Sequence, residues 1–316
     1  MALPTISGGG SFTRQNIQQI NSNFQALSQP DVWVRPQNGN NNSADGTYAK
    51  PYASLAGLAR IIAPGMVIGL QGVLQEEYTT PIINDVTIVG MANEPRQATS
   101  GGVPNGGGAT WLSPSGGTGA LLTVSGQSWK LQNVYLNNSS TTNPVIRLLN
   151  EGDPPTAADG AGFTLDHCTM TGADNGLLTR GGGYIVINDS TFLLFDDTGD
   201  IALGTEAGGA AGGTGSWMRV TNCQFLGNTR HIDGAFNNCE FAFNHFSYIN
   251  AGVTTTIQID LDGGSNNSVH NNYFDLPYSS VQSTMFTLGT NDRWYFNQFA
   301  TAVDTTTYSF GDPTST

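Results

Sequence analysis

Five aspartates are the residues of this 316-residue chain that could do acid–base chemistry on a glycosidic bond. Asp196, Asp197 and Asp200 belong to the segment FDDTGD, and Asp260 and Asp262 belong to IDLDGG. Glycoside hydrolysis needs two carboxyl groups about 5 to 10 Å apart, which adjacent or alternating aspartates can provide. In IDLDGG, alternation predicts that both carboxylates lie on one outward face. Aspartate is also a common turn residue, and we favour turns for both segments.

A histidine and the cysteines offer two further chemistries. His231 and Asp233 in RHIDG could form a base and its orienting carboxylate, although a turn histidine is the interpretation we favour. Cys168, Cys223 and Cys239 have no CxxC spacing that would indicate zinc. We interpret them as small buried side chains. No residue pattern points to a metal site or to a bound cofactor.

The composition limits the possible partners. The chain has 24 acidic and 11 basic residues, which gives a formal net charge of −13. This charge argues against nucleic acid and against anionic membranes as partners. The N-terminus, MALPTISGGG, lacks the pattern of a signal peptide, and no apolar run approaches the roughly 20 residues that span a bilayer. We therefore expect a soluble protein that is made in a cytoplasm without a standard export signal.

The first periodic segment predicts a short helix. In SFTRQNIQQINSNFQAL, the apolar residues Ile17, Ile20, Phe24 and Leu27 recur at intervals of three, four and three. Isoleucine at both core positions disfavours a two-stranded coil. We expect residues 1–30 to form a docking or oligomerisation helix with its linkers, and we expect a homotrimer. The alternative is a helix that folds back on its own domain.

A six-residue template recurs through the rest of the chain and predicts the fold. Each copy has an apolar residue, any residue, a turn-forming residue, a small residue, any residue and a large apolar residue. The copies are LQNVYL, LDHCTM, INDSTF, VTNCQF, FNNCEF and VHNNYF, which end at Leu136, Met170, Phe192, Phe225, Phe241 and Phe274. Alternating short strands at irregular intervals are typical of a solenoid whose turns differ in their loops. The template places the three cysteines at one inward position and the terminal phenylalanines in a core stack.

The segment before these copies resembles a known family. An apolar stretch is followed by the turn Asp45-Gly46-Thr47, by AKPY and by a helix start at Ser54-Leu55. This order is similar to the opening of pectate-lyase-like β-helix proteins, and tail spikes of tailed phages often begin this way. The resemblance implies an all-β, single-stranded right-handed parallel β-helix over residues 31–316. The short helix, which ends at Pro64-Gly65, is expected to cap its open end. Residues 66–68 and 86–89 are expected to form the first strands, separated by a turn.

The resemblance also raises the possibility of an enzyme, because members of this superfamily include polysaccharide lyases and hydrolases. A calcium-dependent lyase would need an arginine base near clustered carboxylates, and the central repeats offer Arg180, Arg219 and Arg230. Their spacing marks out no pair, and no lyase motif is recognisable. We therefore favour a non-enzymatic protein, with a polysaccharide lyase or glycoside hydrolase as the alternative.

These observations predict a structural protein of a tailed-phage virion. A β-helix spike or fibre would project from the particle, contact other virion proteins through its N-terminus and contribute to attachment to a host-surface glycan. Two alternatives stay open. One is a capsid or neck decoration protein without a ligand, and the other is a depolymerase tail spike.

Overall fold

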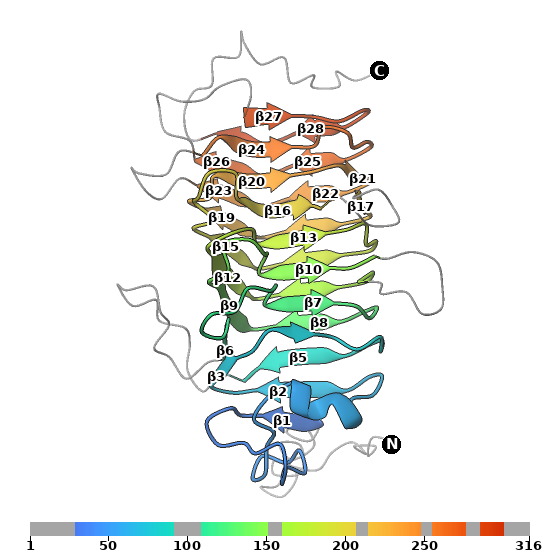
Figure 1. Ribbon diagram of the computed structural model, residues 1–316. Helices are drawn as coiled ribbons and strands as arrows, with labels where there is room; N and C mark the ends of the chain where they lie inside the picture. Colours follow the sequence, from blue (N-terminus) through green and yellow to red (C-terminus); the bar gives the residue numbers. More distant parts are fainter. Residues whose placement is uncertain are drawn as a thin grey trace, which may run out of the picture.

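The computed structural model describes residues 29–91, 109–150, 160–206, 214–247, 255–275 and 285–299. These residues form a right-handed parallel β-helix, as the repeat and the resemblance predicted. The short strands stack in turns from the blue N-terminal end to the red C-terminal end (Figure 1). The predicted helix with Ile17, Ile20, Phe24 and Leu27 lies outside the described residues. Within the described part of the chain, no helix has the length and apolar character needed to cross a membrane.

Three long parallel sheets make up the walls of the solenoid. Sheet A contains, in spatial order, β1 (Val32–Val34), β2 (Val67–Leu70), β5 (Thr87–Gly90), β8 (Lys130–Gln132), β11 (Thr164–Asp166), β14 (Val186–Asn188), β18 (Arg219–Thr221), β22 (Glu240–Ala242), β25 (Ser268–His270) and β28 (Arg293–Tyr295). Sheet B contains β3 (Val73–Gln75), β6 (Ala109–Leu112), β9 (Val134–Asn138), β12 (Thr169–Gly172), β15 (Thr191–Leu193), β19 (Gln224–Leu226), β23 (His245–Ser247), β26 (Tyr273–Asp275) and β29 (Gln298–Phe299). Sheet C contains β4 (Tyr78–Thr79), β7 (Leu122–Val124), β10 (Ile146–Leu148), β13 (Leu177–Thr179), β16 (Ile201–Thr205), β20 (Arg230–Asp233), β24 (Ile257–Asp260) and β27 (Phe286–Thr287). A small additional sheet pairs β17 (Gly215–Ser216) with β21 (Phe236–Asn237).

Single residues with left-handed backbone turn the chain at two corners of each typical turn. The first corner precedes sheet A, and the second corner lies between sheets A and B. At the second corner, Asn133, Asn222 and Asn271 have φ values of 54° to 56°. Asparagine tolerates this conformation better than most residues, which explains the turn position in the sequence template.

The core confirms the predicted aromatic stack but corrects one of its members. Phe192, Phe225, Phe246 and Phe274 stack in sheet B with ring centroids 4.7 to 4.9 Å apart. Phe241 is buried, but it lies in sheet A, where it pairs with Val220 and Val269. The copy FNNCEF therefore spans the first corner, whereas the other copies span the second corner. The copy that the template missed is FAFNHF, which ends at Phe246.

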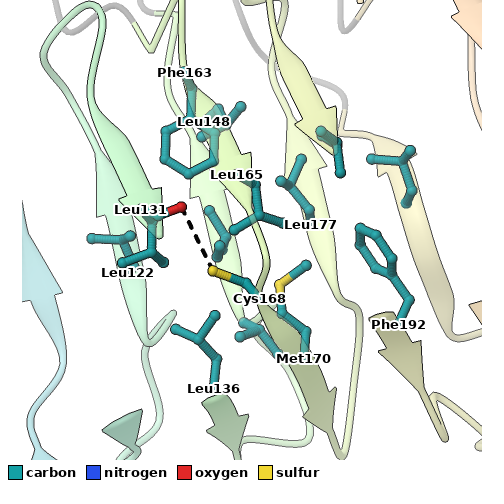
Figure 2. Packing of buried hydrophobic residues seen from close by; sticks show 14 of the residues in the cluster. Leu122, Leu131, Leu136, Leu148, Phe163, Leu165, Cys168, Met170, Leu177 and Phe192 are labelled. Atoms are coloured by element: carbon teal, nitrogen blue, oxygen red, sulfur yellow. Dashed lines mark hydrogen bonds between the residues drawn. The ribbon is translucent and has the colours of Figure 1, made fainter. Parts of the chain in front are cut away.

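The same shift in register separates the three cysteines. All three are buried, as predicted. Cys168 and Cys223 follow the second corner, but Cys239 follows the first corner, so the three do not share one position. In Figure 2, the thiol of Cys168 points toward the carbonyl of Leu131, at a distance of 3.6 Å, among buried leucines. Burial raises the pKa of Cys223 to about 12 and that of Cys239 to about 11, which leaves both thiols protonated and unreactive.

The N-terminal end is capped as the sequence predicted. The helix is a short 3₁₀ helix, η1 (Ala56–Arg60), which lies near β1 and β2 in Figure 1. Leu58 of this helix and Leu55 at its N-cap are fully buried. The carboxylate of Glu76 accepts hydrogen bonds from the backbone N–H groups of Leu55 and Ala56, at 2.8 and 2.9 Å. This contact satisfies donors that the helix start leaves without a partner.

One prediction about this end was wrong. The sequence suggested that the strands near residues 67 and 87 are the first ones, separated only by a turn. In the structure β1 precedes both, and β3 and β4 lie between them. The three elements complete the first turns of the solenoid. They are only two or three residues long, so their alternation is too brief to be read from the sequence.

Candidate functional site

The outer face of sheet A carries a ladder of polar side chains. Gln132, Asp166, Asn188 and Thr221 occupy equivalent positions on the neighbouring strands β8, β11, β14 and β18. The Asp166 carboxylate accepts hydrogen bonds from Gln132 at 3.0 Å and from Asn188 at 3.4 Å. The hydroxyl of Thr221 donates to the Asn188 amide oxygen at 3.1 Å. The ladder arises because period-two strands in register bring equivalent outward residues together.

Asp166 is the charged centre of this ladder. Its carboxylate lies 3.3 Å from the ammonium of Lys130 and 2.8 Å from Nδ1 of His167. Burial acts to raise the pKa of Asp166, but the hydrogen bonds from His167, Lys130 and Asn188 outweigh it and lower that pKa below the usual 3.8. Asp166 is therefore a fixed anion at neutral pH, with a cation beside it.

A second charged group lies three strands further along the same face. Glu240 on β22 contacts the guanidinium of Arg219 at 3.0 Å and Nε2 of His270 at 3.2 Å. The His270 ring stacks on Tyr295, with centroids 4.7 Å apart and planes 9° from parallel. These contacts hold the side chains in the C-terminal part of the face in place, as the contacts of Asp166 do in its middle.

Between the two charged groups lies an open groove of about 640 Å³. Its walls are Lys130, Thr164, Asp166, Val186, Asn188, Arg219, Thr221, Asn222 and Phe243. The lining combines amide, hydroxyl and charged groups with apolar surface. This combination suits a polar ligand that also has apolar faces.

Exposed aromatic residues stand at the first corner, beside this groove. Tyr184 precedes β14 and Trp217 precedes β18, and their side chains are 69% and 56% exposed. Their rings are nearly parallel, with centroids 6.3 Å apart. Both residues have left-handed backbone, with φ values of 59° and 55°. An aromatic residue in this conformation is an energetic outlier, whereas asparagine or glycine is not.

The second corner repeats this arrangement on the opposite edge of sheet A. Phe243 and Phe296 also have positive φ, at 59° and 55°, and are 58% and 78% exposed. Asn222 and Asn271 hold the equivalent position in the turns on either side of Phe243. Exposed aromatics in strained conformations thus border the face on both sides. Strained outliers of this kind concentrate at functional sites.

The predicted aspartates lie elsewhere. Asp260 and Asp262 lie at the end of β24 in sheet C, with Ile259 and Leu261 buried as the alternation predicted. The Asp260 carboxylate accepts the N–H of Asp262 at 3.0 Å, so it stabilises a turn.

Asp196 and Asp197 are both exposed and lie in the loop between β15 and β16. In that loop, the N–H of Asp197 donates to the Asp200 carboxylate at 3.3 Å. The structure does not bring the predicted aspartates into the groove.

His231 lies in β20 and not in a turn, so the interpretation that we favoured was wrong, and His231 does not form the alternative pair with Asp233 either. The two residues face opposite sides of β20, because His231 is fully buried against Phe225 and Phe246 while Asp233 forms an ion pair with Arg230. Burial lowers the pKa of His231 to about 3. The ring is therefore a neutral core residue.

The three arginines considered for a lyase are each paired with a carboxylate. Arg180 shares Glu206 with Arg147 on the outer face of sheet C, at 3.0 and 2.8 Å. Arg219 alone of the predicted arginines lines the groove, and its partner is Glu240.

Asp166, His167 and Asp189 approach closely enough to be considered as metal ligands, with their ligand atoms within 4.8 Å of one another. The Lys130 ammonium, however, already lies against the Asp166 carboxylate. That ammonium contacts Oδ2, and the other carboxylate oxygen, Oδ1, already shares a hydrogen bond with Nδ1 of His167 at 2.8 Å. We assign no metal to this cluster.

Sequence reasoning missed the aromatic borders of the groove. Trp217 and Phe243 stand where the template expects asparagine, and such a departure in a correctly aligned repeat would have been the signal. The template register was wrong at Phe241, which hid the copy that contains Phe243.

Comparison with solved structures finds other β-helix proteins. A pectin methylesterase from Aspergillus niger is 12% identical, with 87% of this chain and 88% of that chain covered and a TM-score of 0.49. A rhamnogalacturonan lyase is 15% identical, with 77% and 68% covered and a TM-score of 0.43. A pectate lyase is 13% identical, with 85% and 78% covered and a TM-score of 0.41. These similarities concern the fold. No protein-family model and no curated protein matches the chain.

Proposed function

We propose that this protein binds a glycan along the outer face of sheet A. The observation that carries the proposal is the placement of exposed aromatics with strained backbone along both edges of sheet A, with Tyr184 and Trp217 at the first corner and Phe243, which lines the polar groove, at the second. Aromatic rings stack on the C–H faces of sugar rings, while amides, hydroxyls and charged groups bind the sugar hydroxyls. The groove offers both kinds of contact within reach of each other.

The strain argues against a purely structural role for the aromatics. A left-handed backbone costs an ordinary L-residue about 1 to 2 kcal/mol. Trp217 recovers only part of the burial energy open to a tryptophan, because more than half of its side chain is exposed. Asparagine holds the same position in the next two turns, at Asn238 and Asn266. A contact with a ligand accounts for an exposed aromatic residue at a corner where asparagine adopts the left-handed backbone at a lower cost.

The groove favours binding over catalysis. Asp166 is held as an anion between Lys130 and His167, so it does not offer a proton as a general acid at neutral pH. This arrangement agrees with a protein that binds a glycan and does not cleave it.

We extend the proposal to the biological setting. The chain would be a spike or fibre on the particle of a tailed phage, assembled as a homotrimer and attached to other virion proteins through residues 1–30. The support is the resemblance of the opening segment to phage β-helix proteins, together with the rigid solenoid. A density map of the particle that located the N-terminus would test this setting. Absence of the chain from purified particles would contradict it.

Glycan binding is tested by an array of bacterial surface polysaccharides, followed by titration of the best hits with tryptophan fluorescence as the signal. Trp217 is far more exposed than the buried Trp111, Trp129 and Trp294, so its emission should change most on binding. The change should be lost in Trp217→Asn and kept in Trp33→Phe at the N-terminal end. If no glycan binds with Kd below about 1 mM, which corresponds to roughly −4 kcal/mol, the proposal is wrong.

A further inference from the structure

The charges of the groove are already matched within the protein. Lys130 and Arg219 are the two cations that line it, and they contact Asp166 at 3.3 Å and Glu240 at 3.0 Å. Asp189 adds a further carboxylate at the adjacent second corner, 3.8 Å from Nε2 of His167. Each of the two cations therefore already has a carboxylate partner, and neither is left to bind an anion without competition.

The remaining contacts of the groove suit uncharged groups. Asn188, Thr221 and Asn222 present amide and hydroxyl groups between the two ion pairs. Val186, which is 37% exposed, and Phe243 add apolar surface to the lining. An anionic polymer would have to displace an internal carboxylate at each cation. It would also approach a chain whose net charge is −13, which repels it over roughly a Debye length of 8 to 10 Å.

We infer that the ligand of the groove is a neutral glycan, built of hexose or N-acetylhexosamine units without carboxylate, sulfate or phosphate groups. The inference rests on the proposed function and specifies its ligand class. Stacking on the aromatic borders and hydrogen bonds to the amides supply the affinity. The two ion pairs keep the charged side chains of the groove in place. They also leave the groove without a net positive charge.

The test is calorimetric titration with two series of oligosaccharides of equal length, one neutral and one of uronic acids, at about 50 and 500 mM NaCl. The neutral series should bind at least about tenfold tighter, and its Kd should change less than about twofold between the two salt concentrations, because no ion pair forms on binding. Tighter binding of the uronates, weakened by salt, would overturn the inference and leave the proposed function standing. Failure of both series to bind would overturn both.

A pair of matched variants tests the role of the internal carboxylate. Glu240→Gln releases Arg219 from its partner, and Asp262→Asn removes the same charge from a turn of sheet C. Uronate affinity should rise at least about threefold in Glu240→Gln and stay within about 1.5-fold of wild type in Asp262→Asn. Equal effects of the two variants would mean that net charge alone excludes anions, and the assigned role of the groove would be wrong.

Discussion

Trp217 and Asn238 occupy the same corner in adjacent turns of the solenoid, joined by a backbone hydrogen bond of 3.0 Å from the N–H of Trp217 to the carbonyl of Asn237. Their φ values are 55° and 56°. One backbone conformation is thus held by a residue that tolerates it and by a residue that does not. The fold therefore requires the left-handed backbone at this corner, but it does not require the aromatic side chain of Trp217 there.

The first prediction follows from this pair. Trp217→Asn should leave the free energy of unfolding unchanged or raise it by up to about 1 kcal/mol, because relief of backbone strain offsets the loss of the contact with Tyr184. Glycan affinity should fall at least about tenfold. Denaturant unfolding and glycan titration of the same sample measure both effects. A clear loss of stability with unchanged affinity would make Trp217 a structural residue.

The second corner supplies an independent version of this test. Phe243→Asn copies the residue found at Asn222 and Asn271, so it should also preserve stability. Since Phe243 lines the groove, the variant should weaken glycan binding at least about threefold. The melting temperature should therefore change little while the affinity for the glycan falls.

The core stack makes the second prediction. Phe225 is fully buried between Phe192 and Phe246, so Phe225→Ala should destabilise the protein by about 3 to 5 kcal/mol. Cys223→Ser should destabilise it less, because the hydroxyl can still donate to the carbonyl of Thr221 as the thiol does. Phe296→Asn, at an exposed corner, is the control and should change the melting temperature little. Equal effects of Phe225→Ala and Phe296→Asn would refute the assigned register.

His231 makes the third prediction, which concerns acid stability. Its pKa is about 3 in the folded protein and near 6.5 when the chain unfolds, so between these values the unfolded state binds more protons. The contribution of His231 is full above pH 6.5 and is lost as the pH falls toward 3, at up to about 1.4 kcal/mol per pH unit.

The variant His231→Gln stays neutral at every pH and should lose stability less steeply in this range. Chemical denaturation at pH 7, 5 and 4 measures the two slopes. Identical slopes would show that His231 is not a buried neutral group. The carboxylates with lowered pKa, Asp166 and Glu206, also lose stability in acid, but they do so in both proteins.

The fourth prediction concerns catalysis by the aspartates that the sequence singled out. Asp196→Ala, Asp197→Ala, Asp260→Ala and Asp262→Ala should leave glycan binding and particle assembly intact. The wild-type protein should release no reducing or unsaturated ends from host polysaccharide, with or without calcium. Steady release that vanished in one of the four variants would establish a depolymerase with that aspartate as its acid or nucleophile.

The fold could be predicted from the sequence because short segments with alternating inward and outward residues recur along the chain. The inward positions of Leu131, Leu165 and Ile187 recur with the turn residues that follow them. The register failed at Phe241 because both corners use the same arrangement of a turn residue, a small buried residue and a strand. A template of six residues cannot distinguish two corners that obey the same backbone physics.

The groove could not be predicted in the same way. Lys130 and Arg219 are 89 positions apart in the chain, and only the stacking of β8, β11, β14 and β18 brings them to one face. The aspartates attracted attention because they are close in sequence, yet Asp260 stabilises a turn. In a solenoid, a site is assembled from single residues of successive turns, so spacing along the chain says little about it.

A crystal structure with the best glycan from the array tests the central claim most directly. The account predicts sugar density on the outer face of sheet A, with a ring against Trp217 or Phe243 and hydrogen bonds to Asn188 or Thr221. Density confined to the outer faces of sheets B or C, with Trp217 free of contact, would contradict it.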